Sequence, residues 1–180
     1  MKTHPLHIRS TSNIFFCVGL ATLALTASAD DKQPPLMQVP AGNYIAWNAP
    51  ATGHMIYTCQ VILTDGTKHG WKITSASAVL SDKAGSLSGT YHSPPDTWKS
   101  ADGSALTGME MVRAPSGVNT LYDQLVLANP STGAGLLAGV TYIQRLVNAG
   151  GLPATPCTSS NVGTQEKVAY QANYVFWKPN

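Results

Sequence analysis

The alternation of apolar and polar positions is clearest in two segments, His54–Leu63 and Val168–Trp177. In the first segment, every second residue contributes to one apolar face: Met55, Tyr57, Cys59 and Val61. In the second, the corresponding face carries Tyr170, Ala172, Tyr174 and Phe176. Because successive side chains of a strand point to opposite sides, a period of two predicts β-strands. The opposite face of the first segment also holds Ile56 and Ile62, so we expect this strand to lie in the centre of a sheet.

Elsewhere the chain alternates short runs of β-branched and aromatic residues with clusters of Gly, Asp, Ser and Pro, which is typical of strands joined by turns. The remaining predicted strands are Asn43–Trp47, Gly70–Ser75, Leu87–His92, Leu106–Arg113, Leu125–Ala128 and Val140–Val147. Asp65-Gly66 and Asp102-Gly103 are turn dipeptides of the hairpin kind. No stretch shows a helical period over about a dozen residues with capping signals. We therefore predict an all-β fold, a single-domain β-sandwich or partly closed β-barrel of about 8–10 short strands.

The first 29 residues have the pattern of a signal peptide. Lys2 and Arg9 precede an uncharged, mostly apolar run at 14–25, and Ala27-Ser28-Ala29 supplies the small residues that a signal peptidase recognises. The apolar run is shorter than the roughly 20 residues that a membrane-spanning helix needs, so we expect no integral membrane segment after cleavage. The sequence predicts a secreted or periplasmic protein with a signal peptide at 1–29, an extended lead-in at 30–40 and a single β domain at 41–180.

Removal of the leader leaves a chain without net charge. The full sequence has 11 Lys and Arg against 9 Asp and Glu, and the signal peptide contains Lys2 and Arg9 but no acidic residue, so nine of each sign remain. A neutral surface has neither the basic footprint of a nucleic-acid-binding protein nor the polybasic stripe that holds a protein on anionic lipid. We therefore expect no nucleic acid among its partners.

Two cysteines, Cys59 and Cys157, remain after cleavage, because Cys17 belongs to the signal peptide. In an exported protein such a pair predicts a disulfide. A bridge that closes a loop of about 100 residues stabilises a fold by roughly 4–5 kcal/mol on the chain-entropy model. A metal site is the alternative, but neither cysteine has the Cys-x-x-Cys or His-x-x-x-His spacing of zinc ligands.

A glycine-rich segment, Gly133–Ala138, matches the G-x-G-x-x-A pattern of dinucleotide-binding proteins. Such a site needs a helix after the glycines, whereas the β-branched and aromatic run Val140-Thr141-Tyr142-Ile143 follows here. We interpret the segment as a loop and expect no cofactor. His54, His69 and His92 have no metal-ligand spacing, so we expect no metal site either.

Two sets of residues have the types that a hydrolase needs. Ser104, His92 and Asp102 fit a nucleophile, a base and an orienting acid, although Asp102-Gly103-Ser104 also has the composition of a tight turn. Glu110 and Asp123 form the best acidic pair for glycoside hydrolysis, which requires two carboxyl groups at a set separation. One functional hypothesis is therefore a secreted hydrolase of cell-wall or plant polymers, using His92 with Asp102 or Glu110.

An aromatic residue in polar, turn-rich sequence favours a different hypothesis. Trp98 stands between Pro94-Pro95-Asp96-Thr97 and Lys99-Ser100-Ala101-Asp102. Packing under a loop is the commoner role of a Trp in such a setting, and an exposed ring that stacks on a sugar or a small ligand is the functional one. The candidate ligand-binding residues, with Trp98 stacking and the others hydrogen bonding, are His92, Trp98, Asp102 and Arg145. The leading hypothesis is a non-enzymatic binding module for a small molecule, a glycan or a surface partner.

The following segments occur in order along the chain: Gly53-His54-Met55-Ile56-Tyr57-Thr58-Cys59, Trp71, Ala78–Gly85, His92–Trp98, Asp102-Gly103-Ser104, Leu125-Val126-Leu127, Val140–Arg145, Gly150-Gly151, Cys157 and Tyr170–Phe176. Together, over about Leu36 to Trp177, they resemble the secreted bacterial and fungal family called domain of unknown function 3455. The chain departs from the family pattern before Trp98, where the family usually has Gly-Pro-Thr-Trp, and at Gln124, where it tends to have Trp. The resemblance implies an exported domain and transfers no catalytic residue, because the family carries no established activity.

Overall fold

The computed structural model describes residues 34–62 and 66–180, and its regular elements there are β-strands and two short 3-10 helices. The predicted signal peptide lies outside the described residues. The strands are β1 (Asn43–Val61), β2 (His69–Ser81), β3 (Leu87–Ser93), β4 (Thr97–Ser100), β5 (Ala105–Ala114), β6 (Asp123–Ala128), β7 (Tyr142–Gly150) and β8 (Gln165–Pro179). The 3-10 helices are η1 (Pro35–Met37) and η2 (Ser159–Asn161). The all-β prediction is confirmed.

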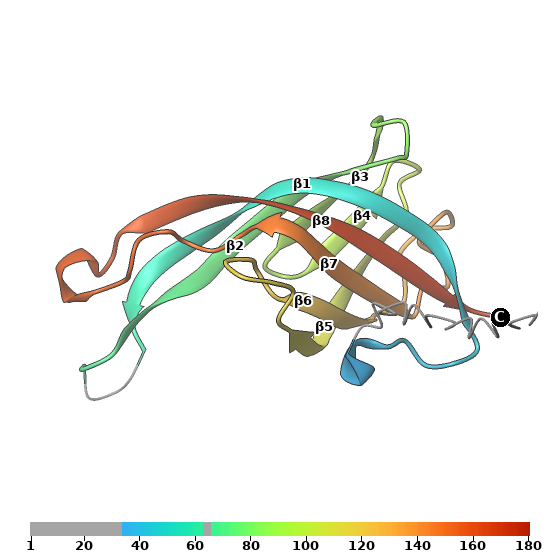
Figure 1. Cartoon of the computed structure of the whole chain (residues 1–180). Coiled ribbons are helices and arrows are strands. Elements are labelled where there is room, and N and C mark those ends of the chain that lie inside the picture. Colours follow the sequence, from blue (N-terminus) through green and yellow to red (C-terminus); the bar gives the residue numbers. More distant parts are fainter. Residues whose placement is uncertain (1–33, 63–65) are drawn as a thin grey trace, which may run out of the picture. The chain divides into compact units, whose positions relative to one another are not determined.

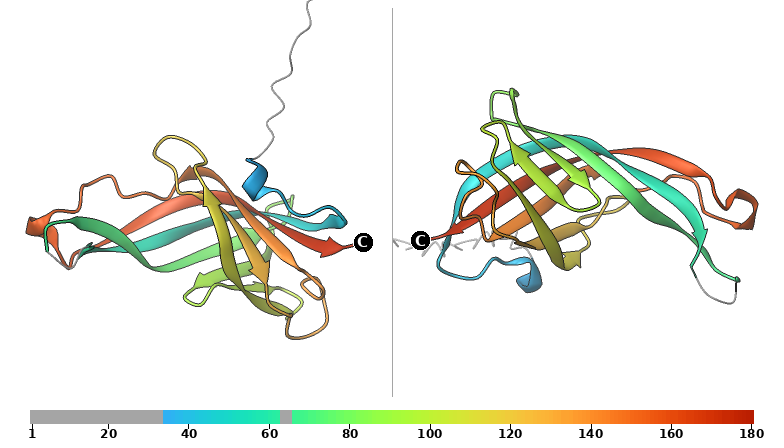
Figure 2. Two further views of the ribbon diagram at one scale, coloured as in Figure 1. Left: turned by 90° about the horizontal axis from the view of Figure 1, so that it is seen from below. Right: turned by 180° about the vertical axis from the view of Figure 1, so that it is seen from behind.

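The described strands close into one antiparallel ring in sequence order, with β1 paired to both β2 and β8. Of the two predicted architectures, the structure is therefore the barrel. Closure gives every strand two neighbours over part of its length, which removes the open edges there. The first residues of β2 and of β8 pair with β1 alone. On one side of the ring, β1, β2 and β8 extend beyond the other strands (Figure 1), and this is visible from two further directions (Figure 2).

β1 joins two predicted strands into a single strand of 19 residues. Pro50 is tolerated within it because pairing with β2 begins only at Ala51, so the missing N–H of the proline faces no second partner strand. Gly53 lies between both neighbours, and a Cβ at this position would collide with the carbonyl of Ser77 and with the side chain of Ala78. The Pro and Gly between the two predicted strands therefore allow one long strand to pass closely between its neighbours.

One part of the barrel interior is filled by aromatic rings. Trp98 is 0% exposed, and its ring centroid lies 5.1 Å from that of Tyr91 and 6.1 Å from that of Tyr174. Trp47 stacks on Phe176 with ring centroids 4.7 Å apart. Contacts of this kind add to the large apolar area that aromatic side chains bury, so this cluster is the main hydrophobic core.

The segment before β1 packs against the outside of the barrel. Of the predicted extended lead-in, residues 34–40 are described, and they include η1. Met37 is fully buried against Ala114 and Leu125, and its carbonyl accepts a hydrogen bond of 2.6 Å from Gln144. The lead-in thus contributes a small second apolar cluster.

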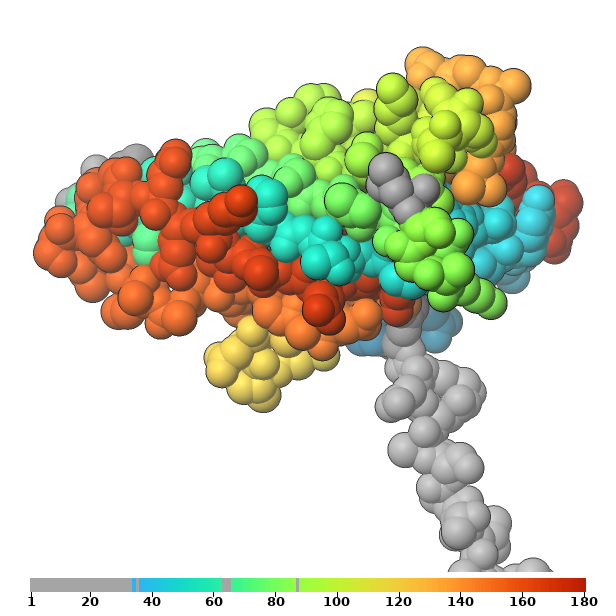
Figure 3. All heavy atoms as spheres, turned by 90° about the horizontal axis from the view of Figure 1, so that it is seen from above, coloured from blue at the N-terminus to red at the C-terminus, as the bar shows by residue number. Residues whose placement is uncertain are grey.

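A disulfide joins Cys59 of β1 to Cys157, with their Cα atoms 5.4 Å apart. Backbone hydrogen bonds reinforce the attachment: the Cys59 N–H donates to the Thr164 carbonyl, and the Gly163 N–H donates to the Cys59 carbonyl. The segment between β7 and β8 is thereby held against the far end of β1, where the two lie side by side on the surface (Figure 3). None of the described residues belongs to a helix that is long and apolar enough to cross a membrane.

Candidate functional site

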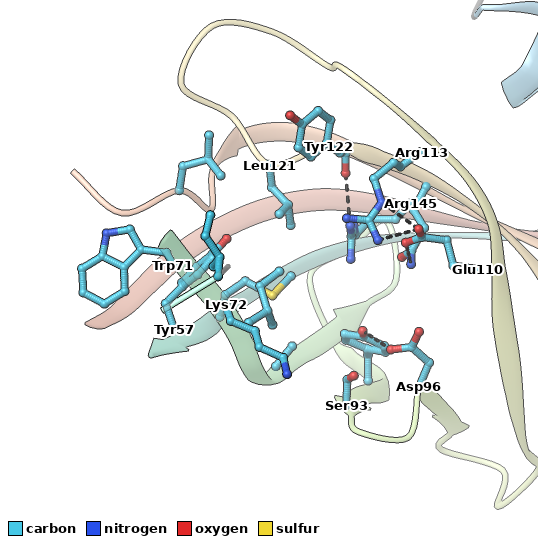
Figure 4. Close-up of a pocket in the computed structure, with 17 residues that line it drawn as sticks. Tyr57, Trp71, Lys72, Ser93, Asp96, Glu110, Arg113, Leu121, Tyr122 and Arg145 are labelled. Carbon is cyan, nitrogen blue, oxygen red and sulfur yellow. Dashed lines mark hydrogen bonds and ion pairs between the residues drawn. The ribbon is translucent and has the colours of Figure 1, made fainter. Parts of the chain in front are cut away.

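A cavity of about 600 Å³ lies beside the aromatic core, where the extended parts of β1 and β2 face residues of β3, β5, β6 and β7. Its two ends differ in chemistry. Arg145, Arg113 and Glu110 gather at one end, whereas Trp71 lies at the other (Figure 4). Met55 also lines the space. The volume falls within the range of roughly 300–1,000 Å³ that is usual for sites of small organic ligands.

Arg145 is the central polar residue of the cavity. It lies on β7 directly opposite Gln124 of β6 and Tyr174 of β8, and the alternation of β7 turns it inward together with Ile143. Arg145 is only 7% exposed; its Nη2 donates to the Tyr122 carbonyl at 3.1 Å, and its Nε has no hydrogen-bond partner. In the part of the chain that the structure describes, no carboxylate lies within ion-pair distance of this guanidinium. Arg145 is therefore a buried cation without an ion-pair partner among the described residues, and Asp123 acts on it only electrostatically.

Gln124 is the neighbour of Arg145 in the β6–β7 ladder and is 6% exposed. Its Nε2 donates to a carboxylate oxygen of Glu110 at 2.6 Å, while its Oε1 has no partner. Glu110 is also paired with Arg113, at 2.6 Å. A buried polar atom without a partner costs on the order of 1–3 kcal/mol, and such atoms are normally satisfied by a ligand or by water. Two adjacent side chains that line this end of the cavity thus each carry one unpartnered polar atom, a donor on Arg145 and an acceptor on Gln124.

Tyrosine hydroxyl groups surround the remaining polar part of the site. The Tyr57 hydroxyl donates to the Gly151 carbonyl, and burial raises the pKa of Tyr57 to about 12 although Arg145 opposes this. The Tyr91 hydroxyl donates to Asp96 at 2.7 Å, and burial together with Asp96 raises its pKa. Burial by itself lowers the pKa of Arg145, but the tyrosines around it, Tyr174 first, raise it, and the net pKa is raised. At physiological pH the site therefore presents neutral phenols around the cationic guanidinium of Arg145.

The structure does not bring the four predicted ligand-binding residues together. Arg145 lines the cavity, but Trp98 is part of the core rather than an exposed stacking ring. The cause is the alternation within β4, which buries Trp98 and Ser100 and exposes Lys99. β4 is only four residues long and lies between two turns, so local composition does not reveal it as a strand.

His92 and Asp102 also lie away from the cavity lining. His92 is exposed on β3, next to the inward-facing Tyr91. Asp102 lies in the turn between β4 and β5, where its carboxylate accepts hydrogen bonds from the Ser104 hydroxyl at 2.6 Å, the Ser104 N–H at 2.9 Å and the Leu136 N–H at 2.6 Å. These hydrogen bonds, that from the Ser104 side chain first, lower the pKa of Asp102 to about 2. The turn interpretation of Asp102-Gly103-Ser104 is the one that the geometry supports.

The residues proposed for hydrolysis are engaged in other interactions. Ser104 is fully buried, and among the described residues His92 makes no hydrogen bond to Asp102 or Glu110. Asp123 accepts a hydrogen bond of 2.7 Å from the Val147 N–H, and burial raises its pKa. In the described ranges, no group of three or more His, Cys, Asp or Glu side chains is arranged to hold a metal ion. The glycine-rich segment 133–138 forms a loop, as predicted.

Gln124, Tyr91 and Asp96 are among the cavity residues that the sequence did not identify as site residues. Tyr57 was already on the inner face predicted from the alternation of its strand, but nothing local marks Gln124 as special. Its position follows from the β6–β7 register, which sets it directly opposite Arg145. Gln124 directly precedes the predicted strand Leu125–Ala128, and its place two residues before Val126, on the same face of an extended strand, was the available signal.

Fold and cavity together define an antiparallel β-barrel that encloses a space of ligand size. Residues 40–178 match the sequence model of the family described as "Protein of unknown function (DUF3455)", and the chain belongs to this family. The resemblance drawn from the sequence is confirmed. No curated protein and no solved structure shows a significant match to the chain.

Proposed function

We propose that this protein is an exported barrel that binds a small organic molecule in its cavity without transforming it. The observation that carries the proposal is the cavity of about 600 Å³ beside the aromatic core. Its lining combines apolar side chains such as Met55 and Leu121 with a few buried polar groups, of which Arg145 is the most enclosed. This combination is typical of sites that enclose a ligand and orient it.

Two observations favour a small molecule over a glycan and binding over hydrolysis. Trp98, the ring expected to stack on a sugar, is buried in the core. A hydrolase needs a base within hydrogen-bond reach of the proton that it removes. His92 is exposed on β3 outside the cavity lining, and Glu110 is occupied by Arg113 and Gln124.

Export is supported by two features that are independent of the cavity. The N-terminal sequence has the charged, apolar and small-residue regions of a signal peptide. The disulfide between Cys59 and Cys157 fits an oxidising compartment, because thiols in the cytosol are kept reduced.

The proposal is tested with the neutral probe N-phenyl-1-naphthylamine, whose fluorescence rises in an apolar environment. Ile73 lines the cavity and is partly exposed, so Ile73→Trp fills part of the cavity without disturbing the core. Val79 is a matched control, because it is also partly exposed on β2 but does not line the cavity.

We expect saturable binding to the unaltered protein and to Val79→Trp, and at least about tenfold weaker binding to Ile73→Trp, because loss of apolar contact and of space is worth more than about 1.4 kcal/mol. Equal affinity of the probe for both variants would show that it binds outside this cavity. Absence of saturable binding to the unaltered protein would refute the proposal.

A further inference from the structure

We infer that the ligand is a carboxylic acid with an apolar body and a hydrogen-bond donor next to its carboxylate, held by Arg145 and Gln124. This inference rests on the proposed function, because it assigns ligand chemistry to the same cavity. It is carried by two unpartnered atoms on side chains that are more than nine-tenths buried, Nε of Arg145 and Oε1 of Gln124.

The Arg145 guanidinium is the reason to expect an anionic group on the ligand. Its Nη2 is fixed by the Tyr122 carbonyl and its Nε is free. Asp123 acts on it electrostatically, but no described carboxylate lies within ion-pair distance of it. A charge enclosed in protein without a partner is costly, and a carboxylate entering the cavity compensates it. Guanidinium and carboxylate match in geometry and form short charge-assisted hydrogen bonds.

The charge of the cavity lining favours a single negative charge on the ligand. The lining contains three cationic side chains and two carboxylates, which are Lys72, Arg113, Arg145, Asp96 and Glu110. One positive charge is therefore in excess, and Arg113 is already paired with Glu110. A monoanionic carboxylate balances this excess, whereas a phosphate dianion would add repulsion from Glu110 and Asp96.

The position of Gln124 explains why the ligand should carry a hydrogen-bond donor next to its carboxylate. Because Gln124 and Arg145 are directly opposite in the β6–β7 ladder, their Cβ atoms are roughly 4.5–5.5 Å apart. One small head group therefore reaches both side chains. The free Oε1 accepts a hydrogen bond but cannot give one, so the ligand has to supply a donor such as a hydroxyl beside the carboxylate.

The opposite end of the cavity accounts for the apolar body. Met55, Leu121 and Leu152 line the cavity, and Trp71 lies at the end away from Arg145 (Figure 4). The indole N–H of Trp71 already donates to the Thr155 carbonyl at 2.7 Å, so this ring has only apolar surface left to offer. A ligand that places its carboxylate on Arg145 therefore extends an apolar group toward Trp71.

Three probes of similar size separate these features in calorimetric titrations of the oxidised protein: 3-phenyllactate, 3-phenylpropanoate and 3-phenylpropanamide. We expect 3-phenylpropanoate to bind about tenfold to a hundredfold more tightly than the uncharged amide, because it makes charge-assisted hydrogen bonds. The hydroxyl of 3-phenyllactate should add a further factor of about three to ten by donating to Gln124. No variant is needed for this comparison, so folding defects do not affect it.

Two variants assign the effects to residues. Gln124→Leu should abolish the advantage of 3-phenyllactate over 3-phenylpropanoate, while Gln171→Leu, at an exposed position of β8, should retain it. Arg145→Met should bring the affinity for 3-phenylpropanoate down to that for the amide.

Equal affinity for 3-phenylpropanoate and its amide would show that the ligand does not need an anionic group. Equal affinity for the two acids would show that it does not need a donor beside the carboxylate. Tighter binding of 2-phenylethyl phosphate would show that the site does not prefer a single negative charge. If N-phenyl-1-naphthylamine binds but none of the three probes displaces it, the ligand chemistry is wrong and the proposed function stands; if nothing binds, both fail.

Discussion

Two adjacent rows of side chains inside the barrel have opposite character. The first row consists of apolar residues that face one another across β6, β7 and β8: Val126, Ile143 and Phe176. Two positions further along each strand, the second row consists of Gln124, Arg145 and Tyr174. Both rows are on the same inward face, because side-chain direction in a strand repeats every two residues. The barrel thus changes from a filled core to a polar cavity within one step of the strand period.

The energetic roles of the two rows differ accordingly. Each side chain of the apolar row stabilises the fold by burying area, at about 25 cal/mol per Å². The polar row includes two unpartnered buried atoms, each of which costs on the order of 1–3 kcal/mol. Sites that bind ligands commonly give up stability in this way. The two unpartnered side chains of this candidate site therefore belong to strands of the scaffold, β6 and β7, rather than to loops.

The largest effect is expected in the filled part. Trp98→Ala should lower the free energy of unfolding by about 3–5 kcal/mol, because it removes a fully buried ring in contact with Tyr91 and Tyr174. Urea denaturation monitored by circular dichroism measures this loss. Tyr44→Ala, at a half-exposed position of β1, is the control and should cost less than about 1 kcal/mol. A similarly small loss in Trp98→Ala would mean that the ring is not part of the core.

The polar row should respond in the opposite direction. Arg145→Met should raise the free energy of unfolding by about 1 kcal/mol, because an apolar side chain of similar length replaces a buried charge that lacks an ion-pair partner among the described residues. The same urea titration measures it. Arg113→Met is the control: this residue is exposed and paired with Glu110, so its replacement should change stability by less than about 0.5 kcal/mol. A clear loss of stability in Arg145→Met would make Arg145 a structural residue and weaken the comparison of the two rows.

The strand content and one cavity residue could be predicted from the sequence because both depend on local patterns. Alternation identified the faces of β1 and β8, the pair of cysteines predicted the bridge between Cys59 and Cys157, and Arg145 was a candidate site residue that does line the cavity. Closure of the sheet into a ring could not be predicted, because it depends on pairing between β1 and β8 at opposite ends of the chain.

The positions of Trp98 and Gln124 depend on such long-range pairing. The turn-rich surroundings of Trp98 left both an exposed stacking ring and a packed ring open, and packing against Tyr91 and Tyr174 decides for the packed one. Gln124 becomes notable only when the β6–β7 register sets it beside Arg145. Short strands and polar residues on inward faces are therefore the points at which local reasoning fails, because tertiary contacts decide their environment.

The smallest effect concerns the turn that closes the filled part of the barrel. Asp102 holds the loop that carries the buried Leu137 by accepting hydrogen bonds from Ser104 and Leu136, and these lower its pKa to about 2. Because the folded-state pKa lies below the ordinary value of 3.8, the charged carboxylate stabilises the fold above about pH 3.8, and this contribution is lost as the pH falls toward 2. Asp102→Asn should therefore lower the melting temperature slightly at pH 7, and calorimetric scans should find that the difference from the unaltered protein shrinks between pH 4 and pH 2 and then disappears. A difference that stays constant over this range would show that the charge of Asp102 does not stabilise the turn.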